Sequence, residues 1–561
     1  MMLRLLFLVP AAFCLAFLIA SMRPMGENRK TLLRLSCSPD WQQLDEWLEE
    51  NEIRPVAGSG RYHWKISTRH DSAQFYFDQG INMYYGFHII EAMASFRKAA
   101  RFDPGSAMLQ WAQALAYGPN INDVGYTASR DAFLKSQKAI ELSRECPEKE
   151  KMLIRAQAAR YTGDASEDRR KLNERYADEM AKVYARYPND PDVAALYADA
   201  MMLLHPWDLW NVDGTPKPWT PRIRKVLEKL LARTPTHPGA NHYYIHVMEA
   251  SPFAARALPS ADRLGKLTPA LSHMVHMPSH IYLRTGQYRK GVEVNEAAVR
   301  SYRAMLSQFA PAAGNDFLYL IHNLHMQTNN ALLAGQKNRS EKSAVETMGS
   351  IPPDYLNLPG AMGNYMQYVY MTPLLADVRF GEWEAVLQSS EPPKSQAYAR
   401  AIYHFGRGMA YSHLKRFPEA GDELDALREC MKDSVLFVPM SPFSAAIEGA
   451  RVAEQLLLGA IHEHRNLYEG AVRHYRQADS IEHHMVYNEP RDWLLSPRPY
   501  LGEALTKAGR LHEAEQVFLS DLKRNNENVW ALRGYAVTLE KQKRIVEAKK
   551  VRERSERNTK Y

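Results

Sequence analysis

Two histidine pairs with the same internal spacing lie close together in this chain. His242 and His246 belong to the stretch HPGANHYYIHVMEAS, while His276 and His280 belong to LSHMVHMPSHIY. On a helix, residues four apart share one face, so each pair could present two imidazoles side by side. Neutral imidazole is the commonest metal ligand among side chains, and four nitrogens from two pairs would suit zinc or copper.

The interval between the two pairs indicates a repeat. Each member of the second pair follows its counterpart by 34 residues, a period typical of arrays of helix pairs. In the unit that begins at Ala73, Gly80 stands at position 8, Ala92 at 20, Phe96 at 24 and Pro104 at 32. Small residues let two helices approach closely, the large apolar side chain fills the space between them, and proline ends the second helix.

This frame resembles the tetratricopeptide repeat, and it recurs along the chain. Further units begin at Ala401, Val452, Leu495 and Val529. The fold class that we expect is all-α: a right-handed α-solenoid of stacked helix-turn-helix repeats. The expected organisation is a signal peptide or membrane anchor (1–22), an N-terminal cap segment (23–70), a repeat array with a histidine-rich groove (71–345) and a C-terminal repeat array (346–561).

The histidines keep their places in the repeat frame. His242 and His276 stand at position 5 of consecutive units, His246 and His280 at position 9, and His325 at position 5 of a third unit that begins at Ile321. The resemblance to tetratricopeptide repeats implies that positions 2, 5, 9 and 12 line the concave groove. Four further residues then join the same patch: Glu249 at position 12, His273 and His322 at position 2, and Asn329 at position 9.

Two interpretations of this patch stay open. The histidines could be hydrogen-bonded polar groups of a groove that binds a polypeptide or another ligand. Alternatively, they could hold a zinc or copper ion, with His242, His246, His276, His280 and His325 as the ligands. We favour a binding scaffold, with a metal-dependent enzyme as the alternative, in which Glu249 orients a ligand or accepts a proton. The sequence names no catalytic residue.

Several longer passages are similar to one group of large, mostly bacterial tetratricopeptide-repeat proteins. They include FDQGINMYYGFHIIEAMASFRKAARFDP, ALPSADRL, HMPSHIYLRTGQY and HNLHM. No activity is established for that group, so the resemblance implies a fold rather than a function. The segment IEHHMVYNEPRDW departs from the group's Y-x-E-P-P pattern and follows no repeat spacing, which favours a solvated surface there.

The N-terminus and the overall charge bear on location and partners. Arg4 precedes an apolar run from Leu5 to Ala20, which is short for a membrane span and suits a secretory signal. We therefore expect an exported or membrane-anchored protein on the periplasmic or extracytoplasmic side, attached to the membrane if the segment is not cleaved. The net charge of +7 comes from interspersed charges of both signs, so no nucleic-acid partner is expected.

Overall fold

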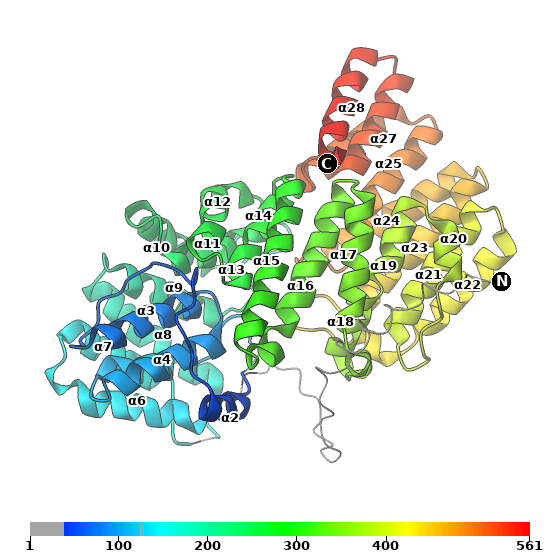
Figure 1. Cartoon of the computed structure of the whole chain (residues 1–561). Coiled ribbons are helices and arrows are strands. Elements are labelled where there is room, and N and C mark those ends of the chain that lie inside the picture. The colour runs from blue at the N-terminus through cyan, green and yellow to red at the C-terminus, as the bar shows by residue number, and fades with distance from the viewer. Residues whose placement is uncertain (1–38, 124–125, 127, 165, 561) are drawn as a thin grey trace, which may run out of the picture. The chain divides into compact units, whose positions relative to one another are not determined.

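The computed structural model describes residues 39–123, 126, 128–164 and 166–560. The predicted signal or anchor at 1–22 therefore lies outside the described residues. Within them, no helix is long and apolar enough to cross a membrane. Residues 36–561 form one compact unit (Figure 1). β-Structure in the described residues is limited to two isolated bridges, Trp210 with Pro216 and Pro439 with Ala445.

The chain is an all-α solenoid, as the repeat frame predicts. Its first half contains α2 (Trp41–Glu50), α3 (Asp71–Tyr85), α4 (Ile89–Phe102), α5 (Ala107–Ala116), α6 (Arg130–Leu142), α7 (Glu148–Ala159), α8 (Arg169–Arg186), α9 (Pro191–Leu203), α10 (Thr220–Arg233), α11 (Pro238–Glu249), α12 (Leu258–Leu267), α13 (Ser272–His276), α14 (Pro278–Arg284), α15 (Tyr288–Gln308) and α16 (Ala312–Leu333). Two short 3-10 helices, η1 (Ser143–Glu145) and η2 (Ala254–Ala257), lie among them.

The second half continues the same pattern of antiparallel pairs. It contains α17 (Lys337–Gly349), η3 (Pro353–Asn357), α18 (Gly360–Tyr370), α19 (Thr372–Phe380), α20 (Trp383–Gln388), α21 (Ala397–His413), α22 (Phe417–Cys430), η4 (Ser434–Phe437), α23 (Ala446–His464), α24 (Tyr468–His484), α25 (Pro497–Lys507), α26 (Leu511–Arg524), α27 (Val529–Lys541) and α28 (Ile545–Thr559). Successive helices pack on each other, as in α3 with α4, α21 with α22 and α23 with α24. The division of the repeats at residues 345 and 346 stays a prediction.

Close packing of glycine against an aromatic ring holds the helix pairs together. Gly80 of α3 lies against Phe96 of α4, and Gly459 of α23 lies against Tyr475 of α24. The buried ring of Phe518 in α26 packs between Gly502 of α25 and a second glycine in α27. These contacts confirm the predicted pairing of a small residue at position 8 with a large one at position 24.

The repeat that carries the second histidine pair has an interrupted first helix. Pro278 has no N–H to donate, so α13 ends at His276 and α14 begins at Pro278. Met277, between them, keeps helical dihedrals of φ −49° and ψ −36°. The chain therefore continues in nearly the same direction through the break, and His276 and His280 stay neighbours.

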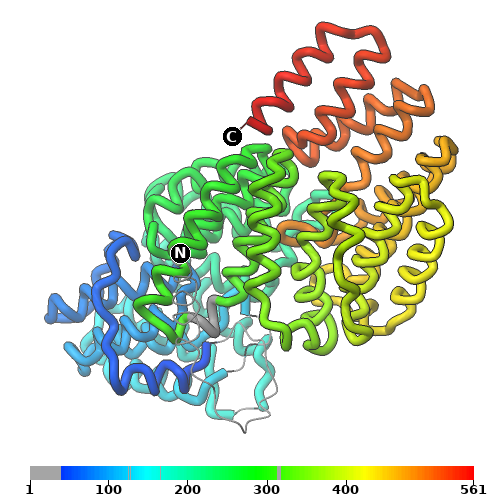
Figure 2. The backbone as a smooth tube through the Cα atoms, turned by 45° about the vertical axis from the view of Figure 1, so that its right-hand side comes forward, coloured from blue at the N-terminus to red at the C-terminus, as the bar shows by residue number. Residues whose placement is uncertain are grey.

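C-terminal helices contact the helices around the histidines. Asn526 Nδ2 donates to the carbonyl of Arg284 at 2.9 Å, and Trp530 Nε1 donates to the carbonyl of Leu332 at 2.8 Å. Figure 2 shows these orange and red segments beside the green helices α14–α16. The connection from α24 to α25, residues 485–496, also runs to the histidines; we call it the strap.

The glycine–aromatic packing predicts the effect of a single methyl group. In Gly502→Ala, the added Cβ would overlap the ring of Phe518, so the free energy of unfolding should fall by about 1–3 kcal/mol. Gly421→Ala in α22 is the matched control, because nothing lies within 4 Å of its added Cβ and alanine favours the helix by about 0.5–1 kcal/mol. Urea unfolding of both variants checks this, and equal effects would contradict the packing.

Candidate metal centre

Helix α11 places the first histidine pair in the interior. Pro238 occupies its first turn, and the Nδ1 of His237 accepts a hydrogen bond from the backbone N–H of Ala240 at 3.1 Å. Both features stabilise a helix start. Every residue of α11 is buried, because α3, α9, α10, α12 and α14 all contact it. Its histidines and Glu249 consequently face protein on all sides.

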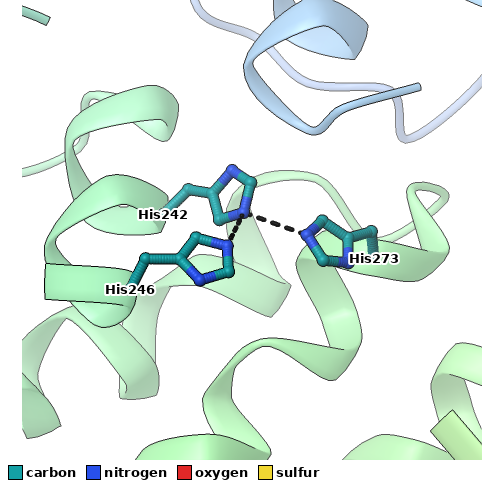
Figure 3. Close-up of side chains that lie close together, drawn as sticks. All are labelled: His242, His246 and His273. Atoms are coloured by element: carbon teal, nitrogen blue, oxygen red, sulfur yellow. Dashed lines mark hydrogen bonds between the residues drawn. The ribbon is translucent and has the colours of Figure 1, made fainter. Parts of the chain in front are cut away.

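Three imidazoles converge at the N-terminal side of the site, and we call them cluster 1: His242, His246 and His273. The Nε2 atom of His242 lies 3.1 Å from Nε2 of His246 and 3.1 Å from Nε2 of His273 (Figure 3). At most 4% of any of these three residues is exposed. His273 comes from α13, so two helices build this cluster.

The hydrogen-bond partners fix which nitrogen of each ring carries the proton. His242 Nδ1 lies 2.7 Å from the carbonyl oxygen of Tyr85, and His246 Nδ1 lies 2.9 Å from Glu249 Oε1. Both oxygens accept, so both Nδ1 atoms carry hydrogen. In a neutral imidazole the Nε2 atom is then a bare lone pair. When both rings are neutral, two lone pairs face each other across 3.1 Å, an arrangement that a cation or a proton between them relieves.

A second group of three imidazoles, cluster 2, repeats this arrangement: His276, His280 and His322. His276 and His280 approach with Nε2 atoms 2.8 Å apart. His276 Nδ1 donates to Oδ1 of Asn295 at 2.6 Å, and the amide of Asn295 is oriented by its own bond to Gly291. The ring of His322, from α16, lies 4.7 Å from that of His276 between centroids. Cluster 2 therefore also brings one ring nitrogen from each of three histidines to within 4.8 Å of the others.

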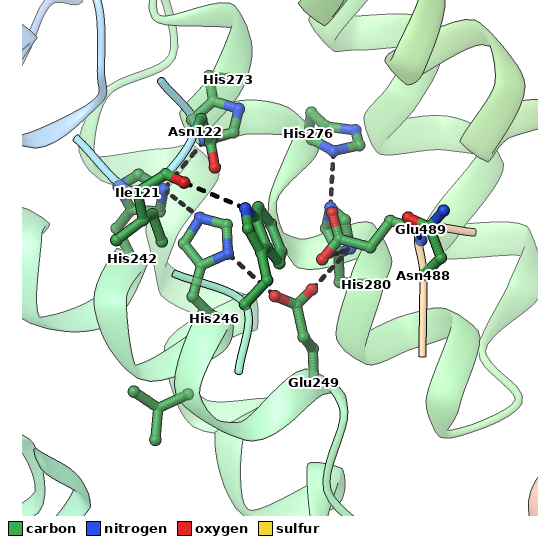
Figure 4. A network of polar contacts seen from close by, with 12 residues as sticks. Ile121, Asn122, His242, His246, Glu249, His273, His276, His280, Asn488 and Glu489 are labelled. Carbon is green, nitrogen blue, oxygen red and sulfur yellow. Dashed lines mark hydrogen bonds and ion pairs between the residues drawn. The ribbon is translucent and has the colours of Figure 1, made fainter. Parts of the chain in front are cut away.

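Glu249 joins the two clusters. Its Oε1 accepts from His246 Nδ1, and its Oε2 lies 2.8 Å from Nδ1 of His280, at an angle that falls short of a hydrogen bond (Figure 4). Burial would raise the pKa of Glu249, but His280, the neighbouring carboxyl group of Glu489 and His246 outweigh it and hold that pKa well below its usual range. Glu249 is therefore an ionised carboxylate that orients one ring of each cluster.

Glu489 reaches the site from the strap, 240 residues after Glu249 in the sequence. Its carboxyl oxygens lie 3.4 Å from His280 Nδ1 and 3.6 Å from His322 Nε2 (Figure 4). Burial and the charge of Glu249 raise the pKa of Glu489 well above its usual range. This direction favours the neutral, protonated form of the Glu489 carboxyl group.

The solvated surface predicted for this segment is wrong for Glu489 and for Trp493, which is 1% exposed. The physical reason is that the strap folds inward onto cluster 2, which no repeat spacing encodes. The surviving E-P pair within NEPRD was the one signal in the sequence for a structured corner. His483 and His484, earlier in the same segment, are exposed as that prediction requires.

Burial favours the neutral form in four of the six cluster imidazoles. Burial, and next to it the neighbouring imidazoles, lower the pKa well below 6.5 for four cluster residues: His242, His273, His276 and His322. Neutral imidazole is the form that binds metal ions, whereas imidazolium cannot. These side chains would bind a metal ion without first releasing a proton near pH 7.

Aromatic rings wall off cluster 1 from solvent. Phe87, which follows α3 with a positive φ of 59°, lies 4.5 Å from the His242 ring between centroids, and Trp207 lies 5.2 Å from the His246 ring. Tyr319 of α16 covers His273 at 4.5 Å. Sequence reasoning missed all three rings, because none stands at a groove position of a histidine repeat.

The structure arranges the predicted residues differently from a single open patch. We expected the two pairs to share one ion; instead each pair is completed by its own third ring, His273 or His322. The groove that we expected to be concave and accessible is, at these positions, closed protein interior. His325 lies outside both clusters, 5.5 Å from the ring of Tyr368, and Asn329 is buried with no partner for either amide atom.

Comparison with solved structures finds repeat proteins at low similarity. The human IFIT1 dimer with m7Gppp-AAAA has 14% identity to this chain, covers 92% of it and 94% of its own length, and gives a TM-score of 0.29. Yeast Tom70 has 13% identity with coverages of 87% and 92% and a TM-score of 0.28. The TPR domain of P58(IPK) has 13% identity, coverages of 78% and 98% and a TM-score of 0.21.

Neither the family models nor the curated proteins match this chain. At the TM-scores above, the solved structures carry no argument about ligands or activity. The class of protein therefore rests on the chain's own packing. It is an all-α solenoid of tetratricopeptide-type helix pairs with a buried centre of histidines and carboxylates.

His325 gives a pH test that is separate from the clusters. Burial lowers its pKa to about 3, and neither ring nitrogen has a hydrogen-bond partner. The unfolded chain protonates this residue below about pH 6.5 but the folded chain does not, so folding loses about 2 kcal/mol from this residue alone between pH 7 and pH 5. In His325→Leu, metal-free protein should lose that much less stability over this interval in urea unfolding. If the variant lost as much free energy of unfolding between pH 7 and pH 5 as the unaltered protein, the pKa of His325 would not be lowered in the folded chain.

Proposed function

We propose that this chain is a metalloprotein that binds transition-metal ions at clusters 1 and 2, inside the solenoid. The observation that carries the proposal is the close approach of two buried Nε2 atoms at 3.1 Å in cluster 1, repeated at 2.8 Å in cluster 2. A metal ion between such nitrogens replaces a repulsion with two coordinate bonds. Nitrogens bound to one tetrahedral ion at about 2.0–2.1 Å are separated by little more than 3 Å.

The donor set favours zinc or copper. Each cluster brings three ring nitrogens within 4.8 Å of one another. Imidazole is a good ligand for both metals, and three histidines leave the fourth position of a tetrahedral ion open. Three of the six rings have the orienting hydrogen bond that metal-binding histidines usually have: His242 to the carbonyl of Tyr85, His246 to Glu249, and His276 to Asn295.

A metal-dependent enzyme is the second candidate, and one cavity favours it. A chamber of about 10 Å³ beside cluster 1 is lined by Trp207, His246, Glu249 and Tyr487, among others. That volume holds about one water molecule. A water next to an open metal position and a carboxyl pair is the arrangement in which metal ions lower the pKa of water. Metal binding without turnover would leave the metalloprotein proposal intact and remove the enzyme.

A polypeptide ligand stays a proposal for other surfaces of the solenoid. The buried imidazoles offer no face to a peptide, so the histidines do not argue for such a partner. Export and membrane attachment likewise stay predictions that depend on residues 1–22.

Metal analysis of one variant pair tests the proposal. His276→Ala removes a ligand of cluster 2, so the full-length protein should bind about one equivalent of zinc fewer than the unaltered protein in equilibrium dialysis with elemental analysis. His484→Ala is the control, because that side chain is exposed on α24 and should leave the metal content unchanged. Equal metal content in all three proteins, or none in any of them after loading with zinc and with copper, would refute the metal centre.

A further inference from the structure

A cleft on the other side of the strap has the size of a small-molecule site. Its volume is about 440 Å³, within the range of about 300–1,000 Å³ for such sites. Its walls come from the connection before α10, the residues after α11, the end of α14, the strap, α25 and α26. Five cationic side chains line it: Arg284, Arg491, Arg498, Lys523 and Arg524.

Part of this positive charge has no carboxylate partner. Arg498 is paired with Asp479 at 3.0 Å, and Arg491 approaches Glu482 only to 3.8 Å. Arg284 and Arg524 take part in no ion pair among the described residues. Burial lowers the pKa of Arg284, and the nearby charges of Arg524 and Arg491 lower it further. Guanidinium groups repel one another here, and a bound anion would relieve that repulsion.

Two of the guanidinium groups also have unused donors. The Nε atoms of Arg284 and Arg491 are buried and have no hydrogen-bond partner. The hydrogen bonds of these side chains go to neutral groups: Arg284 donates to the carbonyl of Ser251 at 3.3 Å, and Arg491 donates to Asn525 Oδ1 at 2.8 Å. A buried charged donor without an acceptor is costly, and a carboxylate or phosphate supplies the acceptor geometry that arginine matches best.

The cleft and the metal centre share one wall. Tyr487 of the strap lines both the cleft and the small chamber beside His246 and Glu249. Two residues further on, Glu489 contacts cluster 2, while the next residues, Pro490 and Arg491, line the cleft. The hydroxyl of Tyr487 is buried without a partner, and burial, followed by the neighbouring carboxyl groups of Glu249 and Glu489, raises the pKa of Tyr487 well above its usual range.

We propose that this cleft binds a small organic anion, with its carboxylate or phosphate group held by Arg284 and Arg491 and its other end at Tyr487, next to the metal centre. If the metal centre acts on this anion, the cleft is the substrate site, and that part of the proposal rests on the proposed function. Anion binding by itself does not rest on it, because the cleft arginines need no metal ion to bind an anion.

Titration calorimetry of the full-length, metal-free protein tests the proposal, with inorganic phosphate and succinate as separate probes. At least one probe should bind with a Kd below about 10 mM. Arg284→Gln and, independently, Arg491→Gln should weaken that binding by about tenfold or more, since a charge-assisted hydrogen bond is lost. Arg289→Gln, at an exposed position on α15, is the control and should bind as the unaltered protein does.

The outcome distinguishes the two sources of negative charge and the two proposals. Binding of phosphate alone would assign a phosphate ester, and binding of succinate alone a carboxylate. Failure of both probes, or unchanged binding by both cleft variants when they fold normally by circular dichroism, would overturn the anion site. The calorimetry uses metal-free protein, so a failure to bind either anion does not bear on the metal centre. In the same way, anion binding can still be tested if the protein turns out to bind no metal.

Discussion

The central constraint on this structure is the close approach of ring nitrogens in a buried site. The Nε2 atoms of His242 and His246 face each other across 3.1 Å because a backbone carbonyl and Glu249 accept hydrogen bonds from the opposite nitrogens. Burial keeps water from separating the rings, and it disfavours a proton that would carry charge into the interior. The proposed metal ion would satisfy these nitrogens, and the helices around α11 would then be a scaffold that is completed by binding it.

The second constraint is that the carboxyl groups couple sites from distant parts of the chain. Glu249 contacts one imidazole of each cluster, and Glu489 brings the strap against His280 and His322. The Glu249 carboxylate accepts from Nδ1 of His246, which favours the proton on that nitrogen and makes Nε2 of the same ring a stronger ligand. The same strap turns Arg491 toward the cationic cleft. One segment between α24 and α25 thus connects the proposed metal centre to the proposed anion site, and its position depends on the packing of both halves of the solenoid.

The sequence predicts the repeat but only part of the site. The residues at positions 8 and 24 of a repeat meet in a local contact between two successive helices. A contact such as that of Gly80 with Phe96 can therefore be recognised from its fixed spacing in the sequence. His242, His246, His276 and His280 were found in the same way. We predicted His325 as a ligand, whereas the clusters contain His273 and His322 in its place. This difference depends on the twist between stacked helices and on the break at Pro278, and the sequence spacing encodes neither. Phe87 and Glu489 reach the site through a turn and a strap, and only the three-dimensional structure places them there.

X-ray absorption at the zinc edge of the reconstituted full-length protein tests the central claim most directly. The account predicts a first shell of nitrogen neighbours at about 2.0–2.1 Å, with the outer-shell scattering of several imidazole rings around each ion. A first shell dominated by oxygen or sulfur, without imidazole scattering, would show that zinc binds elsewhere. The facing imidazoles would then share a proton rather than a metal ion.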